Sequence, residues 1–440
     1  MNVDLIKVGA AMLNITPARE LPNYFGTTYQ RGAGDTDLLC HAVVLSGGET
    51  EVALISCDLT FVDRILLLRI RNACERRIGI PGKQVMVAAT HDHAAPTTGT
   101  SFLIGPPADP LYLDFLIERV VTAVQTARYA MQPCQVVAGM TEAPGFEMNR
   151  RSVRPGGGIA FQKWAEGYSV EGPVDPKMGF LGFETPDGEP VALVVNYACH
   201  NNVCGGGDGI WHRDLFGCAG DVLREALPSL CATPFLAAPC GDITCGDPRA
   251  RSSLRGDAAA RQVGKVCAEL VVSTYRQAQR KKVSKVGFAS QVLEIPDRPL
   301  SESTFCNDGC RGSDERARAF ARRRYDPEKE AVEGRGNTLC PVEIAVLLLG
   351  DATIITNPAE LFCEYGLEIR EHSPFDVTIM SGLTNGLCGY VPTKRAFEHG
   401  GYETHRTVYT SRLVVEAGET IVRGSLDLLG TARHSYEQKE

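Results

Sequence analysis

Residues 51–93 read EVALISCDLTFVDRILLLRIRNACERRIGIPGKQVMVAATHDH, and this stretch decides the fold. It opens with a β-rich run and continues at 62–78 with apolar residues at helical spacing. The helical pattern stops before Gly79 and Pro81, and the apolar run at 83–90 is typical of a buried strand. The segment up to residue 90 therefore predicts a strand–helix–strand (βαβ) unit, in which a helix joins two parallel strands.

The same alternation continues on both sides of this unit. Residues 41–58 predict two strands joined by a Gly-Gly turn, and residues 112–130 and 256–277 have the pattern of amphipathic helices. Later apolar runs predict strands at 191–199, 234–240 and 376–382, and a hairpin at 344–356. Strands that alternate with helices favour the α/β fold class.

Two long stretches follow neither pattern. Residues 145–185 are rich in Gly, Pro and Arg, and residues 296–340 are polar and charged. Loops of this length in a compact protein are usually functional, so we expect both to border a site or to act as lids. No composition shift marks a domain boundary. We therefore predict a single domain over 1–440, with an insertion or lid loop at 296–340.

Composition excludes several protein classes. The 440 residues are 44% hydrophobic and 22% charged, which is ordinary for a globular protein and unlike a disordered chain or coiled coil. The net charge of −8 argues against a nucleic-acid partner. No apolar stretch approaches the ~18 residues of a membrane span, and the start has no signal-peptide pattern. The 16 cysteines are scattered without zinc-ribbon spacing, so we expect reduced thiols and a cytoplasmic protein.

Three of the nine histidines follow predicted strands directly. His91 and His93 are an i, i+2 pair, which in extended chain points to one side, and His200 follows the strand at 191–199. Ligands of open α/β sheets bind beyond the carboxyl ends of the strands. Further strand ends carry acids at Asp58, Asp242 and Glu360. Such a His and Glu set is typical of an open catalytic zinc site, and buried structural histidines are the alternative.

The motif THDHAAP at 90–96 resembles the THTHSGP motif of the neutral/alkaline non-lysosomal ceramidases. Further segments resemble motifs of that family in the same order: VGAAMLNITP (8–17), VNYACHNN (195–202), PCGDIT (239–244) and GLCGYVPTKRAFEHGGYE (386–403). The resemblance implies the ceramidase catalytic fold, with a mixed sheet core, flanking helices and long loops. It also implies a zinc-dependent hydrolase that cleaves an amide bond.

Carried over position by position, the resemblance implies a role for each matching residue. The zinc ligands of the family fall on His91, His200, Glu360 and Tyr390. Its catalytic set falls on His93, Arg150, Asp242, Thr244 and Tyr402, and its substrate contacts fall on Arg150, Tyr402 and Tyr409. Thr244 replaces the serine of the family motif, so we expect it to act as a hydrogen-bonding position before a nucleophile.

Departures from the family bear on the substrate. The 440 residues contain no counterpart of the family's C-terminal immunoglobulin-like domain, and no apolar groove for an acyl chain is identifiable. The two long stretches carry many arginines, which bind carboxylates in bidentate fashion. We therefore predict attack by a zinc-bound hydroxide on the amide of a small polar substrate, and not on ceramide.

Two alternatives stay open at this point. A zinc-dependent esterase, lactonase or cyclic-amide hydrolase would use the same metal and oxyanion groups. A catalytically inactive metal-binding homologue is the third reading, and the retention of the whole ligand set argues against it. The expected partner is a small-molecule substrate, and the sequence leaves a homo-oligomer open.

Overall fold

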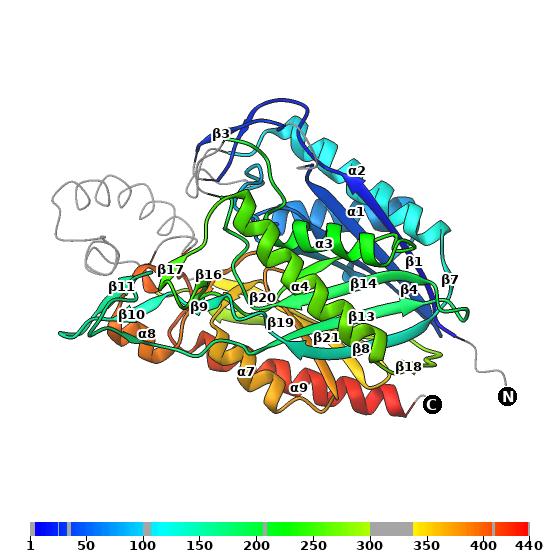
Figure 1. The fold of residues 1–440 in the computed structure, drawn as a ribbon. Helices are drawn as coiled ribbons and strands as arrows, with labels where there is room; N and C mark the ends of the chain where they lie inside the picture. The colour runs from blue at the N-terminus through cyan, green and yellow to red at the C-terminus, as the bar shows by residue number, and fades with distance from the viewer. Residues whose placement is uncertain are drawn as a thin grey trace.

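The computed structural model describes residues 5–24, 26–32, 37–99, 107–205, 209–299, 338–406 and 410–438. Within these ranges three large sheets form the centre, and helices cover their outer faces. In Figure 1, α1 and α2 lie at the top of the molecule and α7 and α9 at the bottom, with the sheets between them. None of the described helices is long and apolar enough to cross a membrane.

The first sheet has the strand order β6-β5-β4-β1-β7. Its strands are β1 (Lys7–Asn14), β4 (Leu39–Gly47), β5 (Thr50–Cys57), β6 (Val85–Ala89) and β7 (Gln132–Pro133). Helix α1 (Arg64–Ile78) joins β5 to β6, which pair in parallel, so the predicted βαβ unit is confirmed. The Asp63 carboxylate caps its first turn, and Gly79 ends it at a φ of 86°. The long helix α2 (Pro110–Tyr129) packs on β1 and β4.

The second sheet has the order β15-β14-β13-β8-β18. Its strands are β8 (Gln135–Glu142), β13 (Lys177–Glu184), β14 (Pro190–Tyr197), β15 (Phe235–Ala237) and β18 (Arg280–Lys281). Helix α3 (Asp214–Ala226) joins the parallel pair β14 and β15, and α4 (Asp257–Gln277) packs on α3 and β8. The loop expected over 145–185 is wrong at its end, because β13 is a buried strand between β8 and β14.

The third sheet has the order β19-β20-β21-β23. Its strands are β19 (Gly287–Pro296), β20 (Leu339–Leu349), β21 (Ala352–Thr356) and β23 (Val377–Ser381). The predicted hairpin turns at Gly350, whose φ is 65°. Helix α7 (Cys363–Glu371) joins the parallel pair β21 and β23, and α9 (Ala417–Glu437) covers β19 and β20. Most of the predicted insertion, 300–337, lies outside the described residues.

Short elements fill the connections. They are β2 (Leu21–Pro22), β3 (Thr28–Tyr29), β9 (Glu147–Asn149), β10 (Arg151–Val153), β11 (Ile159–Phe161), β12 (Ser169–Val170), β16 (Ile243–Asp247), β17 (Ser252–Ser253), β22 (Ala359–Leu361), β24 (Gly389–Val391) and α8 (Lys394–His399).

Each large sheet thus contributes one βαβ unit, and the last strand of each unit is an edge strand that faces the centre. β15 contacts both β6 and β23, and the inner faces of all three sheets share one apolar core. The Asn196 side-chain amide ties two of these edges together, since it donates to Leu236 O at 2.8 Å and to Met380 O at 2.7 Å. The C-terminal ends of these three strands therefore lie close to one another. The polar residues described next follow β6, β14 and β21.

Candidate metal centre and active site

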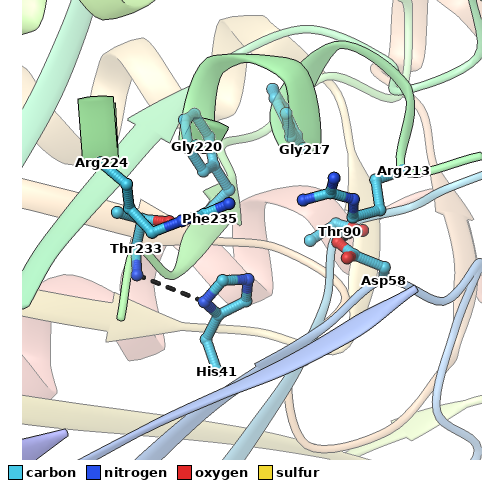
Figure 2. Close-up of a pocket in the computed structure, with 10 residues that line it drawn as sticks. His41, Asp58, Thr90, Arg213, Gly217, Gly220, Arg224, Thr233 and Phe235 are labelled. Carbon is cyan, nitrogen blue, oxygen red and sulfur yellow. Dashed lines mark hydrogen bonds between the residues drawn. The ribbon is translucent and has the colours of Figure 1, made fainter. Parts of the chain in front are cut away.

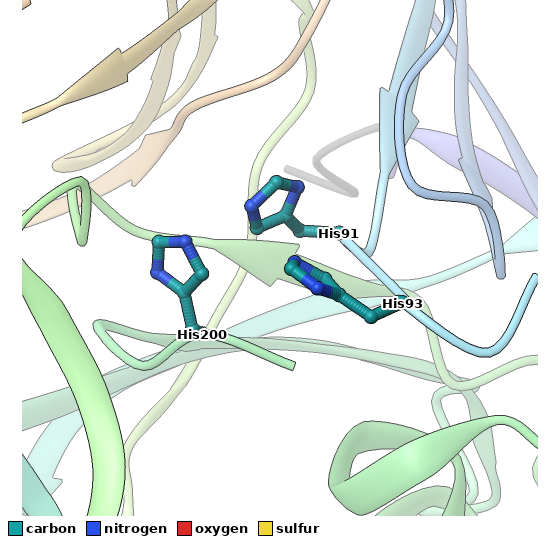
Figure 3. Close-up of side chains that lie close together, drawn as sticks. All are labelled: His91, His93 and His200. Atoms are coloured by element: carbon teal, nitrogen blue, oxygen red, sulfur yellow. The ribbon is translucent and has the colours of Figure 1, made fainter. Parts of the chain in front are cut away.

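Three histidines meet where β6 and β14 end. His91 and His93 follow β6, and His200 follows β14. Their nearest ring nitrogens all lie within 4.8 Å of one another (Figure 3). His91 adopts a φ of 61°, which is strained for a residue other than glycine and turns its ring toward His200. The predicted convergence of histidines from two different strands is therefore present in the structure.

Backbone carbonyls fix the orientation of two of these rings. His91 Nδ1 lies 3.0 Å from Thr60 O, and His200 Nδ1 lies 2.8 Å from Cys240 O. A carbonyl oxygen only accepts, so Nδ1 carries the proton and Nε2 keeps its lone pair. Both Nε2 atoms turn inward, toward the other rings. This is how proteins orient imidazoles that bind metal ions.

Glu360, on the short strand β22, completes the cluster. Its Oε2 atom lies 3.2 Å from His91 Nε2 and 3.5 Å from His200 Nε2. Neither Glu360 Oε2 nor His91 Nε2 has a hydrogen-bond partner, and both atoms are buried. Buried polar atoms without partners are rare and call for a missing ion or water. Two imidazole nitrogens and a carboxylate oxygen form a donor set that fits a divalent transition metal.

The His200 and His93 imidazoles are held in the neutral form that metal binding requires. Burial and the nearby Arg150 guanidinium lower the pKa of His200 to about 3. Burial and the two neighbouring imidazoles also hold the pKa of His93 well below its ordinary value. Neutral rings at pH 7 keep a lone pair for an ion.

The Arg150 side chain lies beside the cluster and forms hydrogen bonds with neighbouring groups. Its Nε donates to Glu403 Oε1 at 2.8 Å, and its Nη2 donates to Tyr390 Oη at 3.1 Å and to Gly241 O at 2.7 Å. Glu403 also accepts from Arg151 Nη1 at 2.6 Å. Both arginines are fully buried; Glu403 is the carboxylate paired with Arg150, while Arg151 also pairs with Glu171. The sequence interpretation missed Glu403, although it directly follows the predicted Tyr402.

One nitrogen of the cluster has a competing contact. Arg150 Nη1 lies 3.1 Å from His200 Nε2, the atom that would bind a metal ion. The hydrogen bond and an ion would use the same lone pair, so they exclude each other.

A cavity of about 460 Å³, here called the site cavity, opens beside the histidines. His93 lies between His91 and the site cavity. It lines the cavity, and its ring centroid is 4.9 Å from that of His91. Three further predicted residues line it: Arg150, Tyr390 and Tyr402. Sequence reasoning missed several other lining residues, including Tyr24, Gln162, Asn202 and Arg255. The volume lies within the range of small-molecule sites.

No family model matches this chain, and neither does any curated protein. Solved structures do match it. The neutral ceramidase from Pseudomonas aeruginosa superposes with a TM-score of 0.75 at 14% identity, over 98% of this chain and 75% of that one. A ceramidase complexed with C2 gives a TM-score of 0.75 at 16% identity, over 98% and 76% of the two chains. The chain has the fold of a neutral ceramidase.

This match confirms the resemblance drawn from the motifs, together with the predicted α/β class and its mixed sheets. At 14% and 16% identity the likeness shows the fold alone.

Two predicted catalytic residues of this ceramidase-like fold lie behind the site cavity and do not line it. Asp242 Oδ1 accepts from Cys363 N at 2.8 Å, and its Oδ2 accepts from Asn149 Nδ2 at 2.6 Å. Thr244 is fully buried on β16, and its hydroxyl accepts from Gln162 Nε2 at 3.4 Å. Gln162 therefore stands between Thr244 and the cavity. Tyr409 lies outside the described residues.

A second, much smaller cavity of about 10 Å³ lies elsewhere in the ceramidase-like fold (Figure 2). His41, Asp58 and Arg213 line it, and His41 Nδ1 accepts from Thr233 N at 3.2 Å. Burial raises the pKa of Asp58 to about 6. The predicted strand-end acid Asp58 thus belongs to this internal polar cluster and not to the histidine cluster.

Proposed function

We propose that this chain is a zinc-dependent amidase that hydrolyses a carbon–nitrogen bond in a small polar substrate. The observation that carries the proposal is the facing pair His91 Nε2 and Glu360 Oε2, two buried atoms without hydrogen-bond partners. They sit next to His200 in a fold shared with an amide-cleaving class of enzyme.

His91, His200 and Glu360 would hold the ion, with Tyr390 beside them. Tyr390 belongs to this set because it is the register partner of Glu360 in the parallel pair β22–β24. A zinc ion bound by such residues polarises a carbonyl and lowers the pKa of a water molecule toward 7.

The chain's own groups supply the rest of the reaction. His93 lines the site cavity and is positioned to take the proton of the attacking water and to pass it to the departing amine nitrogen. As the water oxygen bonds to the carbonyl carbon, negative charge develops on the carbonyl oxygen. The Arg150 guanidinium lines the same cavity and can stabilise this charge. The C–N bond then breaks, which leaves a carboxylic acid and an amine.

The site cavity supports a small polar substrate. Polar side chains such as Asn23, Gln162 and Asn202 line it together with Phe161 and the tyrosines. A long acyl chain would instead favour a large apolar groove, since each buried methylene contributes about 0.8 kcal/mol. The mixed lining therefore favours a compact amide over ceramide.

The decisive experiment combines metal analysis with a substrate screen. Protein purified without added metal should contain close to one zinc per chain, and a chelator should remove both the zinc and the activity. The panel should include N-acyl amino acids, N-acyl amines, lactams, lactones, simple esters and a short-chain ceramide. Hydrolysis of a polar amide at least tenfold faster than the ester, lactone and ceramide supports the proposal.

Other outcomes point to named alternatives. Faster turnover of esters or lactones would make the chain an esterase or lactonase on the same centre. Faster turnover of ceramide would contradict the polar substrate. Stoichiometric metal without any turnover would indicate a metal-binding protein and overturn the amidase proposal.

A further inference from the structure

We propose that Arg255 binds a carboxylate group of the substrate, so that the chain selects amides that carry a negative charge. This inference rests on the proposed amidase function and adds the residue that sets its specificity. Arg255 was not among the residues expected from the sequence.

The Arg255 guanidinium is held at the site cavity without a carboxylate of its own. Its Nη1 donates to Leu254 O at 2.8 Å, and its Nη2 donates to Gln162 Oε1 at 3.3 Å. No ion pair joins it to an Asp or Glu in the described parts of the chain. Two neutral acceptors position this exposed group, and no carboxylate among the described residues neutralises its positive charge. The other cavity arginine, Arg150, differs because Glu403 neutralises it.

Gln162 fixes the place of this guanidinium. Its backbone has a φ of 51°, a conformation that is costly for a residue other than glycine. Its side-chain oxygen also accepts from Ser253 Oγ at 3.2 Å, and its side-chain nitrogen donates to Thr244 Oγ1 at 3.4 Å. The amide is therefore held at both ends. Arg255 contacts an anchored partner, and this limits the freedom of the arginine before a ligand arrives.

The charge of the site cavity favours an anion. Its described lining includes no Asp or Glu, and since Glu403 pairs with Arg150, the positive charge of this lining comes from Arg255. A carboxylate that enters therefore meets a planar guanidinium, which binds it through two parallel hydrogen bonds, and no like charge on the wall.

The same cavity joins Arg255 to the reacting centre. Arg255 and His93 both line this volume of about 460 Å³, so one small molecule can reach both. Phe161 and Tyr402, whose ring centroids are 5.9 Å apart, also line it and offer an aromatic surface to the part of the substrate between them. The substrate class that fits is a compact amide with its carboxylate a few bonds from the scissile C–N bond.

The test compares matched substrates that differ only in charge. The first pair is N-butanoylglycine, which has a carboxylate on the amine half, and its neutral counterpart N-butanoylethanolamine. The second pair is N-succinylpropylamine, which has a carboxylate on the acyl half, and its neutral counterpart N-butanoylpropylamine. Wild-type enzyme should prefer the anionic member of one pair by at least tenfold in kcat/KM. Arg255→Ala should remove this preference through a higher KM for the anion.

Two further variants separate charge from structure. Arg255→Lys should recover part of the preference, because it keeps the charge but not the planar fork. Arg249→Ala removes an exposed arginine of the same connection that does not line the cavity, and it should keep the full preference. Equal kcat/KM values for the charged and neutral members in the wild type, with no change in Arg255→Ala, would overturn the inference while the amidase proposal stands.

A binding measurement keeps the inference testable if no amide is cleaved. Unhydrolysed N-butanoylglycine, and then N-succinylpropylamine, should raise the melting temperature of the wild-type protein more than that of Arg255→Ala. Such a difference without any turnover would retain the anion site and reject the amidase. Equal shifts for the two proteins with both compounds would reject the anion site.

Discussion

Glu360 and Tyr390 are register partners in the parallel strand pair β22–β24, so a carboxylate and a phenol project side by side from two segments far apart in the sequence. The pair faces His91 on one side, at 3.2 Å from Glu360 Oε2, and Arg150 on the other, at 3.1 Å from Tyr390 Oη. Burial and the neighbouring Glu360 carboxylate raise the pKa of Tyr390 well above its ordinary value. The phenol is thus a neutral group next to the orphaned carboxylate oxygen.

The first prediction concerns the metal ligands. His91→Ala and His200→Ala should each lower the bound zinc by at least tenfold and abolish amide hydrolysis, because each would remove one of the three proposed donors, His91, His200 and Glu360. Elemental analysis after dialysis measures the metal, and circular dichroism checks the fold. His372→Ala, at an exposed histidine, is the control and should keep both metal and activity. Wild-type zinc content in both ligand variants would refute the assignment.

The second prediction concerns the buried ion pair of Arg150 and Glu403. Arg150→Met should lower the free energy of unfolding by about 3–5 kcal/mol, because it leaves part of the charge of a fully buried carboxylate unpaired. The double variant Arg150→Met/Glu403→Gln should lose less than the sum of the two single variants. Urea unfolding measures these values. In contrast, Lys265→Met breaks an exposed i, i+4 pair and should cost under about 1 kcal/mol.

An additive double variant would contradict this account. It would mean that Glu403 is stabilised by Arg151 alone, whose Nη1 donates to Glu403 Oε2 at 2.6 Å.

The regular elements near the start of the chain were predictable because their signals are local. The helix of the first βαβ unit has its apolar spacing, its Asp63 cap and its Gly79 terminus within one short segment. Strand β13 was missed because its sequence, KMGFLGFE, contains two glycines, which disfavour strands. In the structure, side chains from distant segments pack against these two glycines and leave little room for a Cβ atom. A Cβ on Gly182 would lie 2.5 Å from the Tyr275 ring, and one on Gly179 would lie 3.2 Å from Ile379.

The site was predictable only in part, for a related reason. His91, His200 and Glu360 follow strands, and strand ends can be read from apolar runs. Gln162 and Arg255 lie outside such runs, and only tertiary packing brings them together at 3.3 Å. The two residues are far apart in the sequence, and no helix or strand periodicity relates them, so the sequence pattern does not predict this contact.

The third prediction tests the packing behind His93. A Cβ on Gly205 would lie 2.2 Å from the Cβ of His93, so Gly205→Ala must displace the histidine or its loop. We expect kcat to fall at least tenfold while zinc content stays near wild type, because His91, His200 and Glu360 are untouched. Gly430→Ala is the matched control, since its Cβ meets nothing within 4 Å in helix α9. It should keep full activity and gain up to about 1 kcal/mol of stability. Full activity in Gly205→Ala would show that His93 need not be held in this place.

The last prediction concerns acid stability and the second, smaller cavity. Burial is the main cause that lowers the pKa of His41 from its ordinary 6.5 to about 3, and the Arg224 and Arg213 guanidinium groups act in the same direction. Between these two pH values the unfolded chain carries a proton on His41 and the folded chain does not. The unfolded state then binds more protons, so the contribution of His41 to stability is lost as the pH falls, at about 1.4 kcal/mol per pH unit.

His41→Asn removes this titration and can keep an acceptor for Thr233 N, which donates to His41 Nδ1 at 3.2 Å in the wild type. The free energy of unfolding of the wild type relative to the variant should therefore decrease by roughly 1 kcal/mol for each pH unit between 6 and 4. Above pH 7 the difference should be constant, because His41 is neutral in both states there. Urea unfolding of both proteins at several pH values measures this difference in the free energy of unfolding. Subtracting one protein's value from the other's removes the contribution of the carboxylates that titrate in both. A difference that does not change between pH 7 and pH 4 would mean that folded His41 takes up its proton as readily as the unfolded chain, in conflict with its buried position.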